Sequence, residues 1–318
     1  MMVLICGIDV SSSTLEARIG AAGPVGTFAN NAEGIALLAG FCREHGATLA
    51  VMEATGGYER LPYRLLWDAG VPSAVVHAHA VRCYAKAMGR QEKTDQLDAG
   101  MIAVFAAARG TVAVPPPSER QSRLRALVTR LRQLTEHRAM QQNQRRLVTE
   151  ASVLADFDQL LALLTAQIRK IEGEVAELID ADPLWSELNL ALREIKGVAK
   201  RTVARLMAEM PEIGTLNGKV IGKLAGLAPL ADDSGKKKGP RHISGGRANV
   251  RSILFTITLC VRRYNPDFER FACRLEKAGK SKKAIRIALA HKLLTRLNAK
   301  ARDKRRQFAL KIQTQQIV

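Results

Sequence analysis

Four acidic residues of this 318-residue chain stand out by their positions in the sequence. Asp9 closes the first apolar run, and Glu53 directly follows the apolar run Leu49–Met52. Asp95 and Asp98 lie three residues apart at the start of an expected helix, a spacing that puts both on one helical face. Each has an ordinary explanation by itself, as a strand-edge residue or a helix cap. A specific chemistry is indicated only when the four carboxylates are considered as one set.

An acidic residue that closes an apolar strand lies at the carboxyl edge of a sheet, where open α/β sheets keep their sites. Carboxylates that converge there repel one another unless cations neutralise them, and oxygen ligands favour hard divalent metals. Two Mg²⁺ ions about 3.5–4 Å apart would stabilise the attacking and leaving oxygens of an in-line phosphoryl transfer. The four residues therefore predict a divalent-metal site for that chemistry.

The first hundred residues alternate strand and helix signals, which is typical of an α/β layered domain. We expect strands at 3–8, 14–18, 49–52 and 71–76, and helices at 31–45, 58–68 and 99–108. The prolines at 115–117 form a rigid break. We therefore place the first domain at residues 1–114.

The middle of the chain, residues 115–182, is expected to be a helical, coiled-coil linker domain. Its apolar residues alternate spacings of three and four over about three and a half heptads, at Leu154, Phe157, Leu161, Leu164, Ile168, Ile171, Val175 and Leu178. Such a seam fits either a helical hairpin within one chain or an interface between two chains. Its regularity slightly favours the second. Asp182 and Pro183 then begin a new helix, as cap and first residue.

Charge is concentrated in the remaining part, a mostly helical domain over residues 183–318. Residues 1–100 have a net charge of −2, residues 101–200 of +2 and residues 201–318 of +19. Such an excess predicts a nucleic-acid partner, held mainly through its phosphates and released by salt. Aromatic residues make up only 4% of the chain, so base stacking is not expected to be the main mode of binding.

Residues 194–203 resemble a helix-hairpin-helix, whose turn amides and following helix hold a phosphate. Lys200 and Arg201 would then contact nucleic acid. Ala199 replaces the usual second glycine of the turn, so a plain corner between two helices explains the segment nearly as well. A glycine- and lysine-rich loop follows at 234–247.

In their order, these motifs resemble the DEDD transposases of IS110-type insertion sequences, which are related to the Piv DNA invertase and described as bridge-RNA-guided serine recombinases. The resemblance covers essentially the whole chain. The matching segments are Gly7-Ile8-Asp9, Glu53-Ala54-Thr55-Gly56, Lys93-Thr94-Asp95 with Asp98-Ala99, and Gly226-Leu227-Ala228-Pro229 leading to Ser234-Gly235.

The resemblance implies a RuvC-like, RNase H-type domain, a coiled-coil insertion and a C-terminal transposase domain. It also implies that Asp9, Glu53, Asp95 and Asp98 bind two Mg²⁺ ions, with Mn²⁺ as an alternative. Ser234 would attack a DNA phosphodiester and hold the strand covalently. A serine hydroxyl is a weak nucleophile that needs a base or a metal to activate it. Ser244 is a second serine of the same loop that chemistry alone does not exclude.

Several partners follow from the same resemblance: double-stranded DNA at element ends and target, a noncoding guide RNA, and further copies of this chain. A dimer or tetramer would form through the coiled coil, so that one subunit's Ser234 completes another's metal site. The basic residues expected to contact nucleic-acid backbone are Lys236, Lys237, Lys238, Arg241, Arg247 and Arg251, in addition to Lys200 and Arg201.

Five scattered cysteines without a CxxC pair indicate reduced thiols. The first residues lack the basic region of a signal peptide, and no continuous apolar run reaches the length of a membrane helix. We therefore expect a cytoplasmic protein without a membrane partner.

Three other functions compete with the recombinase. A Holliday-junction nuclease would use the same carboxylates with water as the nucleophile. A sugar-kinase or actin-like ATPase would share the Gly7–Ser13 hairpin, but residues 190–318 offer neither its second hairpin nor its adenosine loop. A non-catalytic scaffold would bind nucleic acid without needing Asp9.

Overall fold

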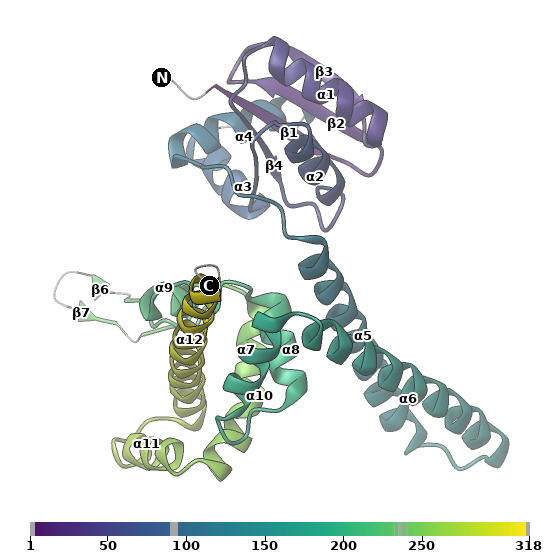
Figure 1. Ribbon diagram of the computed structural model, residues 1–318, viewed down its shortest axis with the longest axis vertical. Helices are drawn as coiled ribbons and strands as arrows, with labels where there is room; N and C mark the ends of the chain where they lie inside the picture. Colours follow the sequence, from purple (N-terminus) through teal and green to yellow (C-terminus); the bar gives the residue numbers. More distant parts are fainter. Residues whose placement is uncertain (1–3, 90–94, 232, 235–236, 240, 316–318) are drawn as a thin grey trace. The chain divides into compact units, whose positions relative to one another are not determined.

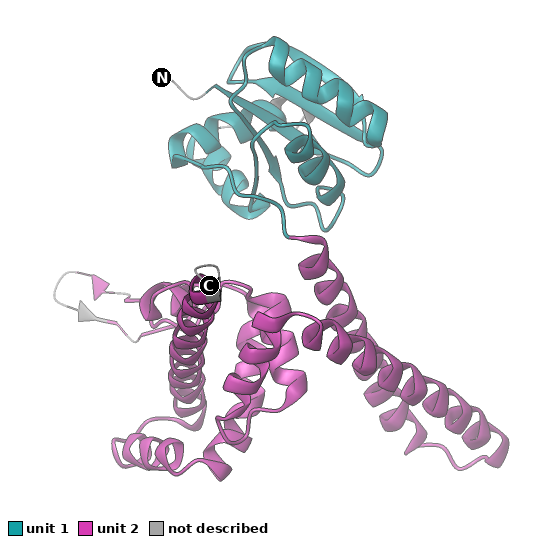
Figure 2. Ribbon diagram, in the orientation of Figure 1, with its two compact units in different colours: residues 1–117 teal, residues 118–318 magenta. Residues whose placement is uncertain are grey.

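The computed structural model describes residues 4–89, 95–231, 233–234, 237–239 and 241–315 (Figure 1). The chain forms two compact units, residues 1–117 and residues 118–318 (Figure 2). The boundary falls at the end of the proline run 115–117. The finer division into three domains stays a prediction.

The first unit is built on a five-stranded sheet in the order β3-β2-β1-β4-β5. β1, β2 and β3 pair antiparallel, whereas β4 pairs parallel with both β1 and β5. This order and orientation are those of an RNase H-type sheet, which confirms the predicted fold class. The strands are β1 (Ile5–Val10), β2 (Thr14–Ile19), β3 (Val25–Ala29), β4 (Leu49–Glu53) and β5 (Ser73–Val76).

Helices cover both faces of this sheet, because its strands alternate apolar side chains toward either side. Ile8 and Leu15 point into a core shared with α1 (Ala32–Glu44) and α2 (Arg60–Asp68). On the other face, Val51 packs with α3 (Ala78–Ala87) and α4 (Asp95–Arg109). Figure 1 shows the sheet between these helices.

Two elements of this unit were not expected from the sequence. β3 is an edge strand whose residues are exposed or half-buried in alternation, so it has no apolar run to reveal it. In α3 only Val81 is buried, which leaves little helical periodicity in the sequence. The other strands and helices of the unit are confirmed, and β1 and β4 extend to include Asp9 and Glu53.

The second unit begins with two long helices, α5 (Glu119–Arg145) and α6 (Ala151–Asp180), packed against each other as a hairpin. The heptad residues Leu164 and Ile168 of α6 are buried against Leu131 and Leu134 of α5. The seam is therefore used within one chain, which corrects the preference for an interface between chains. The physical reason is that five residues, 146–150, connect the helices and return α6 along α5.

Outside the seam, α6 exposes Val153, Leu160 and Leu163. In length and composition it is also the one helix of the described part of the chain that could cross a membrane. Its buried apolar residues nevertheless face α5 and the main core of the unit.

Six more helices complete the second unit around one core. The predicted cap is confirmed, since the Asp182 carboxylate accepts from the Trp185 amide at the start of α7. Buried Asn298 of α12 accepts from the Gly214 amide and donates to the Leu216 carbonyl, both at 2.8 Å. The helices are α7 (Pro183–Arg193), α8 (Lys200–Glu209), α9 (Gly218–Leu224), α10 (Ala248–Tyr264), α11 (Pro266–Lys277) and α12 (Lys282–Gln315).

Candidate active-site residues

Asp9 and Glu53 lie beside each other at the carboxyl edge of the sheet. β1 and β4 run parallel, with Ile8 opposite Met52, so each acidic residue is the next position on its strand. Residues in register on neighbouring strands point to the same face. Both residues are half-buried. The register therefore places two carboxylates where sequence reasoning expected them.

A glycine of β1 lets α4 approach this face closely. A Cβ on Gly7 would stand 2.0 Å from the Ala99 carbonyl oxygen and 2.7 Å from the Ala103 amide nitrogen. Asp98 immediately precedes this contact, and Asp9 follows Gly7 by two residues on the same face of β1. α4 thus brings Asp98 to the side of the sheet that holds Asp9 and Glu53.

The donor chemistry of these residues fits a hard divalent cation, because Mg²⁺ prefers carboxylate oxygens. Within the described ranges, no group of three or more His, Cys, Asp or Glu side chains lies close enough to share an ion. Asp95 begins α4, but its side chain lies outside the described residues. The fit is therefore one of ligand type and of position on neighbouring elements.

Glu59 is a residue of this site that sequence reasoning missed. Its carboxylate accepts from the Gly57 amide at 2.8 Å, and from the Thr55 amide and hydroxyl at 3.2 Å each. Burial opposes ionisation, but the amides of this loop, including its own, outweigh it and lower the pKa of Glu59. Glu59 thereby fixes the loop that follows Glu53. An acid just after a Gly-Gly pair was the only signal in the sequence.

In the second unit, Ser234 lies on a short hairpin of β6 (Asp233–Ser234) and β7 (Lys237–Lys238). Ser234 is exposed and pairs with Lys237 across the hairpin. The Asp233 carboxylate accepts from Arg241 at 2.7 Å and from the Gly239 amide at 3.1 Å. Lys236 lies outside the described residues, as do the side chains of Lys237 and Lys238.

Glycines join this hairpin to the body of the unit. A Cβ on Gly226 would stand 2.2 Å from the Gly245 carbonyl oxygen, and one on Gly246 would stand 2.2 Å from the Gly226 amide nitrogen. Both residues also have left-handed φ angles of +65°. Gly226 therefore packs directly on the turn after Ser244, a role that the sequence did not reveal.

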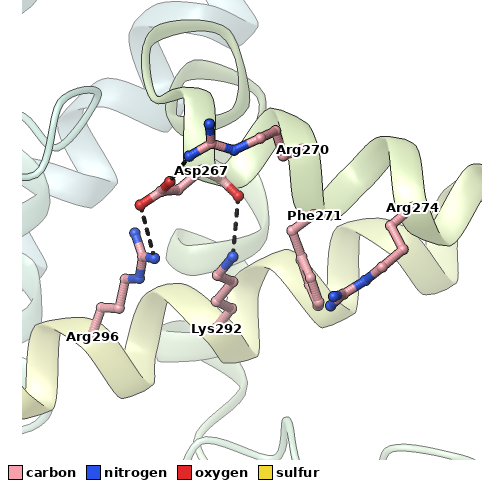
Figure 3. Close-up of a pocket in the computed structure, with 6 residues that line it drawn as sticks. All are labelled: Asp267, Arg270, Phe271, Arg274, Lys292 and Arg296. Carbon is pink, nitrogen blue, oxygen red and sulfur yellow. Dashed lines mark hydrogen bonds and ion pairs between the residues drawn. The ribbon is translucent and has the colours of Figure 1, made fainter.

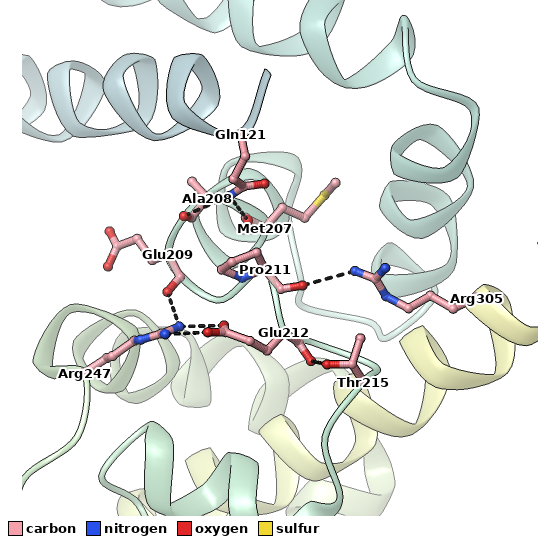
Figure 4. Close-up of polar contacts among 9 residues, drawn as sticks. All are labelled: Gln121, Met207, Ala208, Glu209, Pro211, Glu212, Thr215, Arg247 and Arg305. Carbon is pink, nitrogen blue, oxygen red and sulfur yellow. Dashed lines mark hydrogen bonds and ion pairs between the residues drawn. The ribbon is translucent and has the colours of Figure 1, made fainter. Parts of the chain in front are cut away.

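Arg247 anchors the end of the same loop (Figure 4). Its guanidinium forms two hydrogen bonds with the Glu212 carboxylate, at 2.6 and 2.7 Å, and another with the Glu209 carbonyl at 2.8 Å. Burial opposes ionisation of Glu212, but the Arg247 bonds prevail and lower its pKa. Arg251 donates to the Gly245 carbonyl at 2.7 Å. Both arginines have structural partners, and their contact with nucleic acid stays a prediction.

Lys200 and Arg201 begin α8, after the six-residue connection from α7. Arg201 pairs with Glu172 of α6, while Lys200 is exposed. In the connection, Gly197 has φ +96°, and a Cβ there would stand 2.8 Å from the Val261 backbone. This glycine is needed for packing on α10, which is compatible with either explanation of the turn.

Comparisons with known proteins agree with this arrangement of motifs. A transposase sequence model of the DEDD, IS110 type matches residues 6–152, and the model of the "Transposase IS116/IS110/IS902 family" matches residues 189–273. The two matches follow each other in chain order and together cover more than two thirds of the protein. The chain belongs to the IS110 family of transposases. DNA is accordingly its substrate.

Two similar proteins are pilin gene-inverting proteins of Moraxella. The one from Moraxella bovis is 28% identical over 308 residues, which are 91% of this chain and 92% of that protein. The one from Moraxella lacunata is 28% identical over 286 residues, or 85% and 86% of the two chains. The Thermus thermophilus RuvC structure is 16% identical, with a TM-score of 0.25, over 35% of this chain and 98% of that one.

Proposed function

We propose that this transposase cuts and rejoins DNA by phosphoryl transfer, with a carboxylate metal site on the first unit and Ser234 as the nucleophile. The observation that supports it most is the convergence of Asp9 and Glu53 on adjacent parallel strands, with α4 held close by Gly7. Asp9, Glu53, Asp95 and Asp98 would hold Mg²⁺ or Mn²⁺. Such ions stabilise negative charge on the oxygens of the reacting phosphate.

Ser234 performs the covalent step. Its Oγ forms a bond to phosphorus and loses its proton, while the bond from phosphorus to one bridging oxygen breaks and that oxygen gains a proton. A DNA hydroxyl later reverses the exchange, releasing Ser234 and sealing a new strand. No phosphodiester energy is lost in the two steps, so DNA can be rejoined without another energy source. Insertion and inversion, the activity in the relatives' names, both consist of such steps.

The basic segment around Ser234 supports contact with DNA. The last third of the chain, residues 201–318, has a net charge of +19 and contains the exposed Arg241 together with Lys236, Lys237 and Lys238, while the exposed Lys200 directly precedes it. Arg201, Arg247 and Arg251 would contact phosphates only with the part of each guanidinium that its protein partner leaves exposed. A noncoding guide RNA follows from the family resemblance and should copurify with the protein from its native host.

Assembly of several copies remains part of the proposal, although the heptad seam is occupied by α5. The exposed Val153, Leu160 and Leu163 of α6 offer an apolar strip on the outside of the hairpin. A dimer or tetramer formed there would let one subunit's Ser234 act at another's carboxylates. Sedimentation of the purified protein would test it, since a monomer at all concentrations contradicts the assembly.

Cleavage of labelled element-end DNA tests the carboxylate site. Asp9→Asn and Glu53→Gln each remove a charge with little change of shape, so we expect at least a hundredfold slower Mg²⁺-dependent cleavage with DNA binding retained. Glu44→Gln is the control, because Glu44 is an exposed carboxylate at the end of α1 in the same unit. Equal cleavage by all three variants would contradict the proposal.

A further inference from the structure

A cationic cavity lies between α11 and α12, in a part of the chain that the site described above does not use (Figure 3). Its volume is about 250 Å³. One acidic, one aromatic and four basic side chains line it: Asp267, Phe271, Arg270, Arg274, Lys292 and Arg296. All six belong to the helical unit, so the cavity is complete within one compact body.

The single carboxylate of the cavity does not balance its cations. Asp267 accepts from Arg296 at 3.1 Å and is also paired with Arg270. Lys292 donates instead to the Asp267 backbone carbonyl, at 3.1 Å. Four cations therefore share one acid, which leaves a formal excess of three positive charges around a small space.

This imbalance differs from the charge pairing nearby. On α10, Arg262 has two carboxylates to itself, Glu269 at 2.8 Å and Glu276 at 2.7 Å. Arg247 has its own Glu212, and Lys300 has Glu194. A cluster that served only to stabilise the fold would be expected to have such partners, because like charges held together cost free energy. The four lining cations therefore have fewer carboxylate partners than Arg262 has.

Aromatic rings lie beside three of the four cations. The Lys292 ammonium lies 4.4 Å from the centre of the Phe271 ring, and the Arg274 guanidinium lies 5.2 Å from the same ring. Arg296 lies 5.0 Å from the ring of buried Phe268. Burial, followed by the neighbouring guanidinium groups, lowers the pKa of Lys292. A bound anion would relieve that repulsion.

We propose that this cavity binds a phosphate of a nucleic-acid backbone. It would be a second contact with the strand, in addition to the contact made by the Ser234 hairpin. Guanidinium forks and an ammonium match the oxygens of a phosphodiester. The single carboxylate of the lining, Asp267, is already paired with Arg270 and Arg296. The preference for phosphate rests on the cavity; its assignment to nucleic acid rests on the proposed function.

Binding of a labelled DNA duplex and a labelled RNA hairpin, each over a range of salt concentrations, tests this. Arg270→Gln with Arg274→Gln removes two exposed cations without touching the core, and Lys292→Gln with Arg296→Gln removes the two deeper ones. The matched control is Lys300→Gln with Lys311→Gln, which removes two paired charges from the same α12. Thermal unfolding establishes that each variant is folded.

For the strand that occupies the cavity, we expect the slope of log affinity against log salt to fall by about 0.7–0.9 in either cavity variant, which is the contribution of one lost phosphate contact. Affinity at low salt should fall at least tenfold, with the control close to wild type. Lys292→Arg with Arg296→Lys, which keeps the charges, should recover most of the binding. Comparing the two probes identifies the strand as DNA or RNA.

Equal slopes in the cavity and control variants, on both probes, would overturn the proposal. Thermal unfolding with added pyrophosphate provides a second outcome. If the cavity variants bind both probes as the control does but are no longer stabilised by pyrophosphate as the wild type is, the cavity binds a free phosphate compound, and this would also overturn the proposal. Failure of the proposed function looks different, because the wild-type protein would then show neither Mg²⁺-dependent cleavage nor a Ser234 adduct, whatever the salt slopes of the cavity variants.

Discussion

At the scale of single residues, Gly7 determines how closely α4 can approach the carboxylate edge of the sheet. Its missing side chain is the space into which the Ala99 carbonyl fits. No sequence pattern distinguishes this glycine from a turn glycine, because the close contact joins segments about ninety residues apart. The Gly7-Ile8-Asp9 motif therefore allows α4 to pack closely on β1, and it also positions Asp9 at the edge of the sheet.

Gly7→Ala should lower both stability and cleavage. The added Cβ would lie 2.0 Å from a backbone oxygen, so α4 must move and Asp98 with it. We expect a loss of about 1–3 kcal/mol in the free energy of unfolding, measured by urea denaturation. Gly40→Ala is the control, because Gly40 of α1 faces open space and alanine there should stabilise by about 0.5–1 kcal/mol. Similar effects of the two changes would contradict this role for Gly7.

Glu59→Gln should destabilise the first unit at neutral pH, by about 1 kcal/mol, because an amide is a weaker acceptor for the loop N–H groups. The pKa of Glu59 is lowered by folding, so its contribution is present above the unfolded pKa of about 4.3 and is lost as pH falls through the folded value. Urea denaturation at pH 7 and at pH 3 measures both. A wild-type advantage that is unchanged at pH 3 would rule out the charge as its source.

At the scale of elements, the pairing of α5 with α6 accounts for the heptad pattern of the middle of the chain. The pattern correctly predicted a long helix with one buried face, but it does not specify whether the covering helix belongs to the same chain. Five connecting residues and the apolar face of α5, with Leu131 and Leu134, decide in favour of the hairpin. The strip at Leu160 and Leu163 remains for a different contact.

Ile168→Ala should destabilise the hairpin by about 2–4 kcal/mol, because it leaves a cavity between α5 and α6. Leu163→Ala removes a comparable side chain that is 56% exposed, so we expect less than about 1 kcal/mol. Circular dichroism during thermal unfolding compares them. If Leu163→Ala proved the more destabilising of the two, the assigned packing of α6 would be wrong.

At the end of the loop that bears Ser234, Arg247 forms an ion pair with Glu212. Arg247→Gln should leave Glu212 without its two strongest donors and cost about 1–3 kcal/mol in the second unit. Arg306→Gln, which removes an exposed charge from α12, should change stability by less than about 0.5 kcal/mol. Thermal unfolding of the two variants checks the difference; equal melting temperatures would show that the pair does not anchor the loop.

At the scale of the whole molecule, the candidate metal-binding carboxylates and the excess of basic residues belong to different parts of the chain. The carboxylates belong to the near-neutral first unit, whereas Ser234 and the net charge of +19 belong to the last third. Apolar runs and strand-end acids made the sheet and the adjacent placement of Asp9 and Glu53 predictable, while the metal-binding role of these residues and of Asp98 stays a prediction. The cavity of α11 and α12 was not, because Asp267 and Lys292 meet only when two helices pack.

The roles of individual basic residues could not be predicted either, because they also depend on contacts that form only on folding. Composition predicted a nucleic-acid partner, yet it could not separate cations that already have protein partners from those that remain available. Arg247 pairs with Glu212, and Arg201 with Glu172, through contacts between distant segments. Arg270 and Arg274, which the sequence did not distinguish, lie in a cluster of four cations and one carboxylate that lines a cavity.

The most direct test of the central claim is a search for the covalent protein–DNA adduct. Wild-type protein, Ser234→Ala and Ser244→Ala are each incubated with labelled element-end DNA, Mg²⁺ and any RNA that copurifies, and then separated under denaturing conditions. We predict an adduct that peptide mass spectrometry maps to Ser234, formed equally by Ser244→Ala and absent from Ser234→Ala together with strand transfer. Undiminished cutting by Ser234→Ala, without an adduct in any sample, would contradict the account and identify water as the nucleophile.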